Sequence, residues 1–261
     1  RANVLQAFED KPMAFDAWDI DLYYQEKMQE IDELVEAVVE EAGAVRGTLR
    51  LTWRFYDSTI TQRISLYTAH NRIDFRTEID WHEQQILLKA AFPVNVRATR
   101  ATYDIQFGSI ERPTHWNTSW DYARFEVPLH KWMDISEGDY GVALLNDCKY
   151  GGDVKDNVLR LTLLKSAIRP DALADKGHHE FTYSLYPHGG ERIDLVREGY
   201  ALNLPLHAAV IPAQQGSLPP SYSFASTPSP RLIVETIKRA EDGDGWIIRV
   251  YETLQQRHSA E

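Results

Sequence analysis

The sequence predicts an all-β protein folded as a large antiparallel β-sandwich. Hydrophobic and polar residues alternate with a period of two along much of the chain, which is the pattern of strands with one buried face. Turn signals such as Glu137-Gly138-Asp139 separate these runs. Many consecutive strands without intervening helices favour two stacked antiparallel sheets.

The alternation is clearest in residues 47–56, GTLRLTWRFY, where Leu49 and Leu51 point to one face and Arg50 to the other. Large apolar residues in such strands fill the space between the sheets, so we expect Leu161 and Phe181 to lie in the core. The same reasoning predicts further strands in residues 58–68, 72–81, 85–94, 101–110, 123–129, 140–146, 157–166 and 179–188.

One segment carries conflicting signals. The stretch YYQEKMQEIDELVEAVVEEAG, residues 23–43, is rich in Glu, Met, Ala and Leu, and propensity alone would make it a helix. Val35, Ala37 and Val39 alternate, however, and Gly43 begins a return into the next strand. We expect a strand at about residues 33–42, because tertiary context often overrides propensity.

Composition divides the chain into three parts. Residues 1–212 contain the predicted sandwich core, and residues 213–230 form an irregular connection rich in Pro and Ser. Residues 231–261 read as two strands joined at Asp242-Gly243-Asp244-Gly245. An isolated hairpin is marginal in water, so we expect this one to dock on the sandwich. We expect the chain to be part of a longer protein, because it begins close to the first predicted turn and stops soon after the hairpin.

Charge and cysteine usage exclude several classes of function. Acidic residues exceed basic ones by 11, which argues against a nucleic-acid or anionic membrane partner. No apolar run approaches the length needed to span a bilayer. Cys148 is the single cysteine, so an internal disulfide is excluded and a cytoplasmic location is favoured. Its place in the alternation predicts a small packed residue rather than a nucleophile.

Several long blocks of sequence together resemble one known family. They run in the family's order from about residue 3 to residue 254, which is far more specific than one short motif. On these blocks the chain resembles the C-terminal β-domain of glycoside hydrolase family 38, the α-mannosidases, in the branch of bacterial and cytosolic or vacuolar enzymes. The matching stretches are NVLQAFEDKPMAFDAWDID, RIDFRTEIDWHEQQILLKAAFPV, IERPTHWNTSWDYARFEVPLHKWMDIS, YGVALLNDCKYGGD, ADKGHHEFTYSLYPH and VETIKRAEDGDGWIIRVYE.

The resemblance implies a fold of the supersandwich kind, similar to the galactose mutarotase domain. It implies that the full-length protein is a retaining, zinc-dependent exo-α-mannosidase whose nucleophile and zinc ligands lie in an upstream α/β catalytic domain. On this basis we expect no catalytic residue, metal site or cofactor in residues 1–261. The expected partners are that catalytic domain and a mannoside substrate. A homo-oligomer is also possible, because a sheet edge after Tyr251 is left unpaired.

The first candidate site is Asp16, Trp18 and Asp19. A retaining glycosidase needs two carboxyl groups about 5–5.5 Å apart, and nothing in the sequence gives these aspartates that spacing. The resemblance implies that this domain lends side chains to the rim of the sugar pocket. A tryptophan there can cover the apolar face of a hexose while carboxylates accept bonds from its hydroxyls. Alternatively, Trp18 packs at the domain interface and Asp16 caps a turn.

Two further segments supply candidates for the rim. Asp147 and Tyr150 follow a predicted strand end, where sites are often built, although Asn146 and Asp147 could simply form a turn. Lys165 stands where related sequences often carry arginine. Because lysine cannot make the planar two-pronged contact of a guanidinium, Arg169 is the alternative for a sugar-binding role.

Two other functions remain open at this point. One is an autonomous carbohydrate-binding module, suggested by the cluster around Trp18 and by aromatics around Trp116 and Trp120. The other is a self-contained epimerase-like enzyme, which would need a histidine and a carboxylate converging in a groove. The accessory domain of an α-mannosidase is the function that the resemblance favours.

Overall fold

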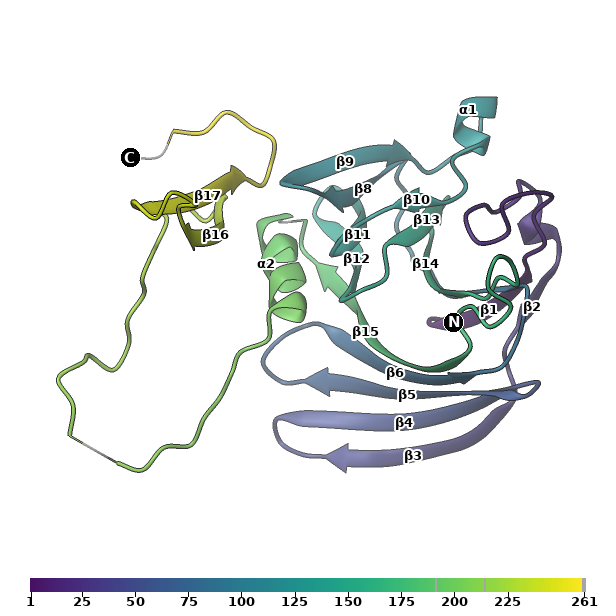
Figure 1. Cartoon of the computed structure of the whole chain (residues 1–261), viewed down its shortest axis with the longest axis horizontal. Helices are drawn as coiled ribbons and strands as arrows, with labels where there is room; N and C mark the ends of the chain where they lie inside the picture. Colours follow the sequence, from purple (N-terminus) through teal and green to yellow (C-terminus); the bar gives the residue numbers. More distant parts are fainter. Residues whose placement is uncertain (191, 214, 260–261) are drawn as a thin grey trace.

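The computed structural model describes residues 1–190, 192–213 and 215–259, and two large sheets dominate it (Figure 1). Every strand pair in both sheets is antiparallel, which confirms the predicted all-β sandwich. The larger sheet has nine strands, in the order β3 (Leu34–Ala42), β4 (Arg46–Phe55), β5 (Ser58–Tyr67), β6 (Ile73–Trp81), β15 (Gly177–His188), β12 (Tyr140–Asn146), β11 (Trp132–Glu137), β8 (Arg100–Ile105) and β9 (Gly108–Pro113).

The smaller sheet draws its strands from distant parts of the chain. It places β1 next to β7 and β7 next to β14. Three strands that are far apart in the sequence therefore lie side by side in one layer. Its six strands are, in order, β10 (Val127–Pro128), β13 (Gly151–Lys155), β14 (Val158–Lys165), β7 (Ile86–Pro93), β1 (Val4–Glu9) and β2 (Met28–Glu30).

The hydrophobic core lies between these two sheets. Tyr183 of the larger sheet stacks on Phe75 with ring centroids 5.2 Å apart, and Phe92 of the smaller sheet meets Tyr183 edge-on at 6.1 Å. Leu161 and Phe181 are both buried here, as the alternation predicts. The core therefore holds the two sheets together, and the loops at their ends lie at the surface.

The ambiguous segment is a strand, β3, which pairs with β4 along its length. Glutamate favours a helix by intrinsic propensity, but here the glutamates pair with arginines of neighbouring strands. Glu36 binds Arg50 of β4 at 2.5 Å, and Glu40 binds Arg63 of β5 at 2.9 Å. These side chains are thus cross-strand partners on the solvated face of a sheet, which is favourable pairing for a strand.

Several features differ from the sequence prediction, which did not locate strands β1, β2, β11 and β13. Residues 101–110 form the hairpin β8–β9 rather than one strand, with a turn that places Phe107 at a φ of 54°. Residues 123–129 contribute only the two-residue strand β10. Helices also interrupt the strands in the described part of the chain, namely the short 3₁₀-helix η1 (Tyr24–Glu26), the capped turn α1 (Ser119–Tyr122) and the longer α2 (Arg192–Asn203).

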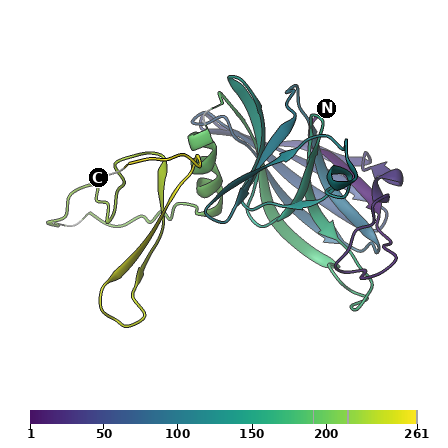
Figure 2. The ribbon, with the colours of Figure 1, turned by 90° about the horizontal axis from the view of Figure 1, so that it is seen from above.

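Helix α2 covers one end of the larger sheet, where Leu195 and Val196 pack with Trp132. Beyond it lies the hairpin of β16 (Leu232–Arg239) and β17 (Trp246–Glu252), at the opposite end of the molecule from the loop after β1 (Figure 1, Figure 2). The Tyr251 hydroxyl lies 3.1 Å from that of Tyr200 on α2. No helix among the described residues is both long and apolar enough to cross a membrane.

Candidate functional site

The loop that follows β1 contains the first group of predicted site residues. Backbone bonds fold it on itself, with Trp18 N donating to Phe15 O at 2.7 Å and Asp19 N donating to the same oxygen at 2.9 Å. The carboxylate of Asp21 accepts from Met13 N at 3.0 Å. The loop is therefore compact, and its apolar side chains are left on the outside.

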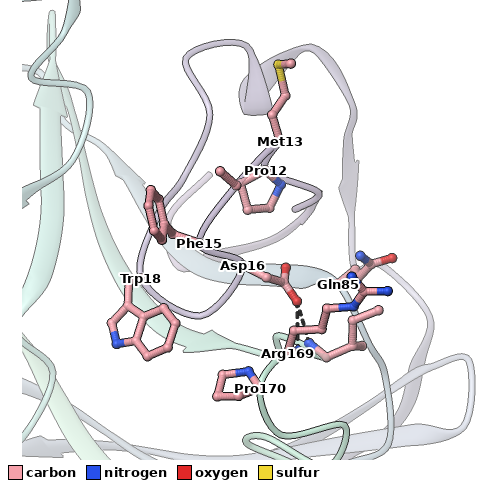
Figure 3. Close-up of a pocket in the computed structure, with 10 residues that line it drawn as sticks. Pro12, Met13, Phe15, Asp16, Trp18, Gln85, Arg169 and Pro170 are labelled. Atoms are coloured by element: carbon pink, nitrogen blue, oxygen red, sulfur yellow. Dashed lines mark hydrogen bonds between the residues drawn. The ribbon is translucent and has the colours of Figure 1, made fainter.

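A second loop, which follows β14, lies against the first. Both of its bonds to Asp16 are made by consecutive backbone amides, Ile168 N at 2.7 Å and Arg169 N at 3.0 Å (Figure 3). A carboxylate that accepts backbone N–H groups is engaged in a charge-assisted contact. Asp16 thus joins two loops that are about 150 residues apart in the sequence.

A buried ion pair connects the same two loops. Lys165 at the end of β14 binds the carboxylate of Asp10, and the Asp10 side chain is almost fully buried. Burial raises the pKa of Asp10, and the Lys165 ammonium acts in the opposite direction. Lys165 is thereby committed to an internal contact.

Gln85, in the turn between β6 and β7, connects the two loops through its backbone. Its N–H donates to Ser166 O at 2.6 Å, and its carbonyl accepts from Asp10 N at 2.8 Å. Three segments of the chain therefore converge at this end of the sandwich.

The two loops enclose an open pocket of about 470 Å³. Its rim is aromatic and cationic, since Phe15 and Trp18 are 72% and 75% exposed and Arg169 is also exposed. Figure 3 shows the rings of Phe15 and Trp18 on one side and Arg169 with Asp16 on the other. The lining residues are Pro12, Met13, Ala14, Phe15, Asp16, Trp18, Gln85, Ile168, Arg169 and Pro170.

The structure brings together three of the seven predicted rim residues, Asp16, Trp18 and Arg169. Asp19 is exposed and its carboxylate accepts from the adjacent Ile20 N at 2.9 Å. Asp19 and Lys165 do not line this pocket. Sequence reasoning missed Phe15 and Gln85, because neither an exposed phenylalanine nor a backbone contact between distant loops leaves a pattern in the sequence.

Asp147 and Tyr150 lie in another loop, between β12 and β13, and do not line the pocket. Asp147 accepts from Thr182 N at 2.8 Å, and the neighbouring Asn146 accepts from Lys149 N at 2.7 Å. Asn146 therefore organises the turn, and Asp147 connects it to strand β15. Tyr150 is exposed beside His130, with ring centroids 6.0 Å apart.

Cys148 corrects one prediction, because it is exposed and not packed in the core. Partial desolvation of the thiol and the carboxylate of Asp147 raise the pKa of Cys148 to about 11. A thiol with so high a pKa is protonated near neutral pH and is a weak nucleophile.

A metal site and a histidine–carboxylate site would each require a particular grouping of side chains. Within residues 1–190, 192–213 and 215–259 no three His, Cys, Asp or Glu side chains are grouped to hold a metal ion. His188 Nε2 lies 2.8 Å from Asp134 Oδ1, but both side chains are buried inside the larger sheet region. This pair therefore stands in the interior and not in a groove.

Comparison with known proteins gives two family matches. Residues 1–173 match the model of the glycosyl hydrolases family 38 C-terminal domain, and residues 231–261 match that of the glycosyl hydrolases family 38 C-terminal beta sandwich domain. The fold and pocket define the chain as a large β-sandwich domain with a surface pocket at one end. With two thirds of its residues inside the first model, the chain belongs to glycoside hydrolase family 38, as its C-terminal domain.

Relatives of known name share this region. Alpha-mannosidase 2C1 of Homo sapiens is 42% identical over 257 residues, and alpha-mannosidase G of Dictyostelium discoideum is 42% identical over 263 residues. The chain spans about a quarter of each relative, 24% of its length. The crystal structure of an alpha-mannosidase from Enterococcus faecalis V583 matches 99% of this chain and 34% of its own, with a TM-score of 0.81 and 16% identity. That likeness concerns the fold.

Proposed function

We propose that this chain is the accessory C-terminal domain of a retaining, zinc-dependent exo-α-mannosidase that removes terminal α-linked mannose from oligosaccharides. Two relatives that are 42% identical to this chain are named alpha-mannosidases, which supports this activity for the full-length enzyme. The aspartate nucleophile and the zinc ligands belong to the part of the enzyme outside this chain. The chain packs on that catalytic domain and contributes side chains to the rim of the sugar pocket.

The pocket between the two loops is the observation that supports the role at the rim. Trp18 exposes a flat apolar surface of the kind that covers the face of a hexose. Arg169 offers several N–H donors to sugar hydroxyls on the opposite side of the pocket. Neither group performs bond cleavage in this proposal, because each contributes to binding and orientation of the terminal sugar.

Substitution of Trp18 tests this role. In the full-length enzyme, Trp18→Ala removes the ring that covers the sugar and should lower kcat/KM for an aryl α-mannoside about tenfold or more. Circular dichroism and the melting temperature should stay unchanged, because the ring is 75% exposed. Trp120→Ala is a matched control, since that ring is 76% exposed and does not line the pocket. Wild-type kinetics in Trp18→Ala would remove Trp18 from the site.

An autonomous carbohydrate-binding module is the second candidate, favoured by the exposed rings at the pocket. The pocket is open on one side, and an open rim with few polar groups gives little affinity by itself. Calorimetry of the isolated chain with mannose and manno-oligosaccharides separates the two functions. Affinity tighter than about millimolar would favour the module, whereas the accessory domain predicts no measurable binding.

A further inference from the structure

The bonds of Asp16 have an unusual arrangement within the pocket. Both N–H groups, from Ile168 and Arg169, donate to a single oxygen, Oδ2. The Asp16 carboxylate therefore holds the backbone of the second loop at Ile168 and Arg169. In Figure 3 the dashed bonds end on the backbone beside the Arg169 side chain and not on its guanidinium group.

This arrangement separates the roles of the two charged residues. Among the described residues no salt bridge is formed by the Arg169 side chain, whereas its backbone N–H is bonded to Asp16. A long exposed side chain with a fixed backbone loses less freedom when it binds a ligand. Asp16 supplies that fixed backbone across the gap between the loops.

We propose that Asp16 is a positioning residue that holds Arg169 in place for contact with the terminal mannoside, and does not itself touch the sugar. This inference rests on the proposed function, in which Arg169 contacts the substrate at the rim. It assigns Asp16 neither to catalysis nor to sugar binding. The specificity of the rim then depends on a contact between two loops within this chain.

Other contacts keep the two loops together when Asp16 is replaced. The buried pair of Asp10 and Lys165 remains, as do both backbone bonds of Gln85. Loss of the Asp16 carboxylate is therefore expected to free the backbone of residues 168–169 without separating the loops. This makes the inference testable in a folded enzyme.

The test is a double-mutant cycle in the full-length enzyme with an aryl α-mannoside as substrate. Arg169→Ala should raise KM about tenfold, the loss expected for a hydrogen bond to a charged group, with kcat nearly unchanged. Asp16→Ala should raise KM by a similar factor when Arg169 is present. In the Arg169→Ala background it should change KM by less than about twofold, because the two residues act as one unit.

A conservative variant and a control complete the experiment. In Asp16→Asn the amide oxygen can still accept both backbone N–H groups, so KM should stay within about twofold of the wild type. If Asp16→Ala does not fold, Asp16→Asn still tests whether the negative charge itself acts on the sugar, because a tenfold rise in KM would overturn the inference. Asp242→Ala is the control, because Asp242 also accepts a backbone N–H, from Asp244, but in the distant β16–β17 turn.

The outcomes distinguish the two proposals. If Arg169→Ala leaves KM unchanged, the rim role of Arg169 is wrong and the inference falls with it. If Arg169→Ala raises KM but Asp16→Ala does not, only the positioning role is overturned. Equal effects of Asp16→Ala in both backgrounds, or a tenfold rise in Asp16→Asn, would show that the carboxylate acts independently of Arg169.

Discussion

Lys89 of β7 is a fully buried lysine on the face of the smaller sheet that points away from the core between the sheets. Its ammonium group lies 2.7 Å from Asp153 and also binds Glu126, and the Tyr24 hydroxyl lies 3.1 Å away. Burial alone would lower the pKa of Lys89, but the two carboxylates outweigh it and raise that pKa. Lys89 therefore stays charged and connects the sheet to the two segments that cover it.

Replacing this lysine should destabilise the domain strongly. Lys89→Met leaves two buried carboxylates with less compensation, and such a loss is expected to cost about 3–5 kcal/mol. Urea unfolding of the 261-residue chain measures the free energy. Lys27→Met is the control, since Lys27 forms an exposed pair with Glu9 and should cost less than about 1 kcal/mol. Equal stability of the two variants would contradict the role of Lys89.

At the scale of single residues, sequence reasoning could find side chains with distinctive chemistry but not their contacts. Trp18, Asp16 and Arg169 carry recognisable functional groups, and all three line the pocket. The ion pair of Lys165 with Asp10 joins residues that are 155 positions apart in the sequence. No local sequence pattern predicts such a contact. The resemblance to a family supplied the expectation that these loops belong to one site.

Among the elements, helix α2 shows how packing is decided by one small residue. Gly199 faces Trp132, and a Cβ atom at this position would lie 2.9 Å from Cδ1 of the buried ring. Only glycine allows the helix to approach the sheet this closely. The helix could not be predicted from its sequence because its apolar residues do not gather on one helical face and one of its buried residues has no side chain.

This contact reverses the usual effect of a glycine substitution. In an exposed helix, Gly→Ala gains about 1 kcal/mol of stability. Gly199→Ala should instead lose about 1–3 kcal/mol through overpacking against Trp132. Thermal unfolding measures the difference, and Gly216→Ala, which has open space around it, should be nearly neutral. A gain in stability for Gly199→Ala would mean that the helix sits further from the ring.

Strands were predictable where hydrophobic and polar residues alternate over many positions, and this held even for β3, which is exposed on both faces. The alternation located β4, β5 and β6 closely, and it located β3 against a contrary propensity. It failed at β8–β9, because the turn between these strands carries no glycine or proline signal before Gly108. Short strands such as β10 contain too few residues for a period to be recognised.

The whole molecule is asymmetric in a way that agrees with its place in a larger enzyme. The loop after β1, which lines the pocket, lies at one end of the molecule and the β16–β17 hairpin at the other (Figure 1, Figure 2). The hairpin exposes apolar side chains, including Ile237, Trp246 and Ile248. The chain spans about a quarter of its named relatives, so it is one part of a family 38 protein.

The central claim is that bond cleavage takes place on residues outside this chain, while the chain itself supports and borders the sugar site. The direct measurement is hydrolysis of an aryl α-mannoside by the purified 261-residue chain with added zinc, beside the full-length enzyme at equal concentration. The account predicts turnover by the full-length enzyme and none above the buffer rate by the chain. Zinc-dependent turnover by the chain alone would contradict it.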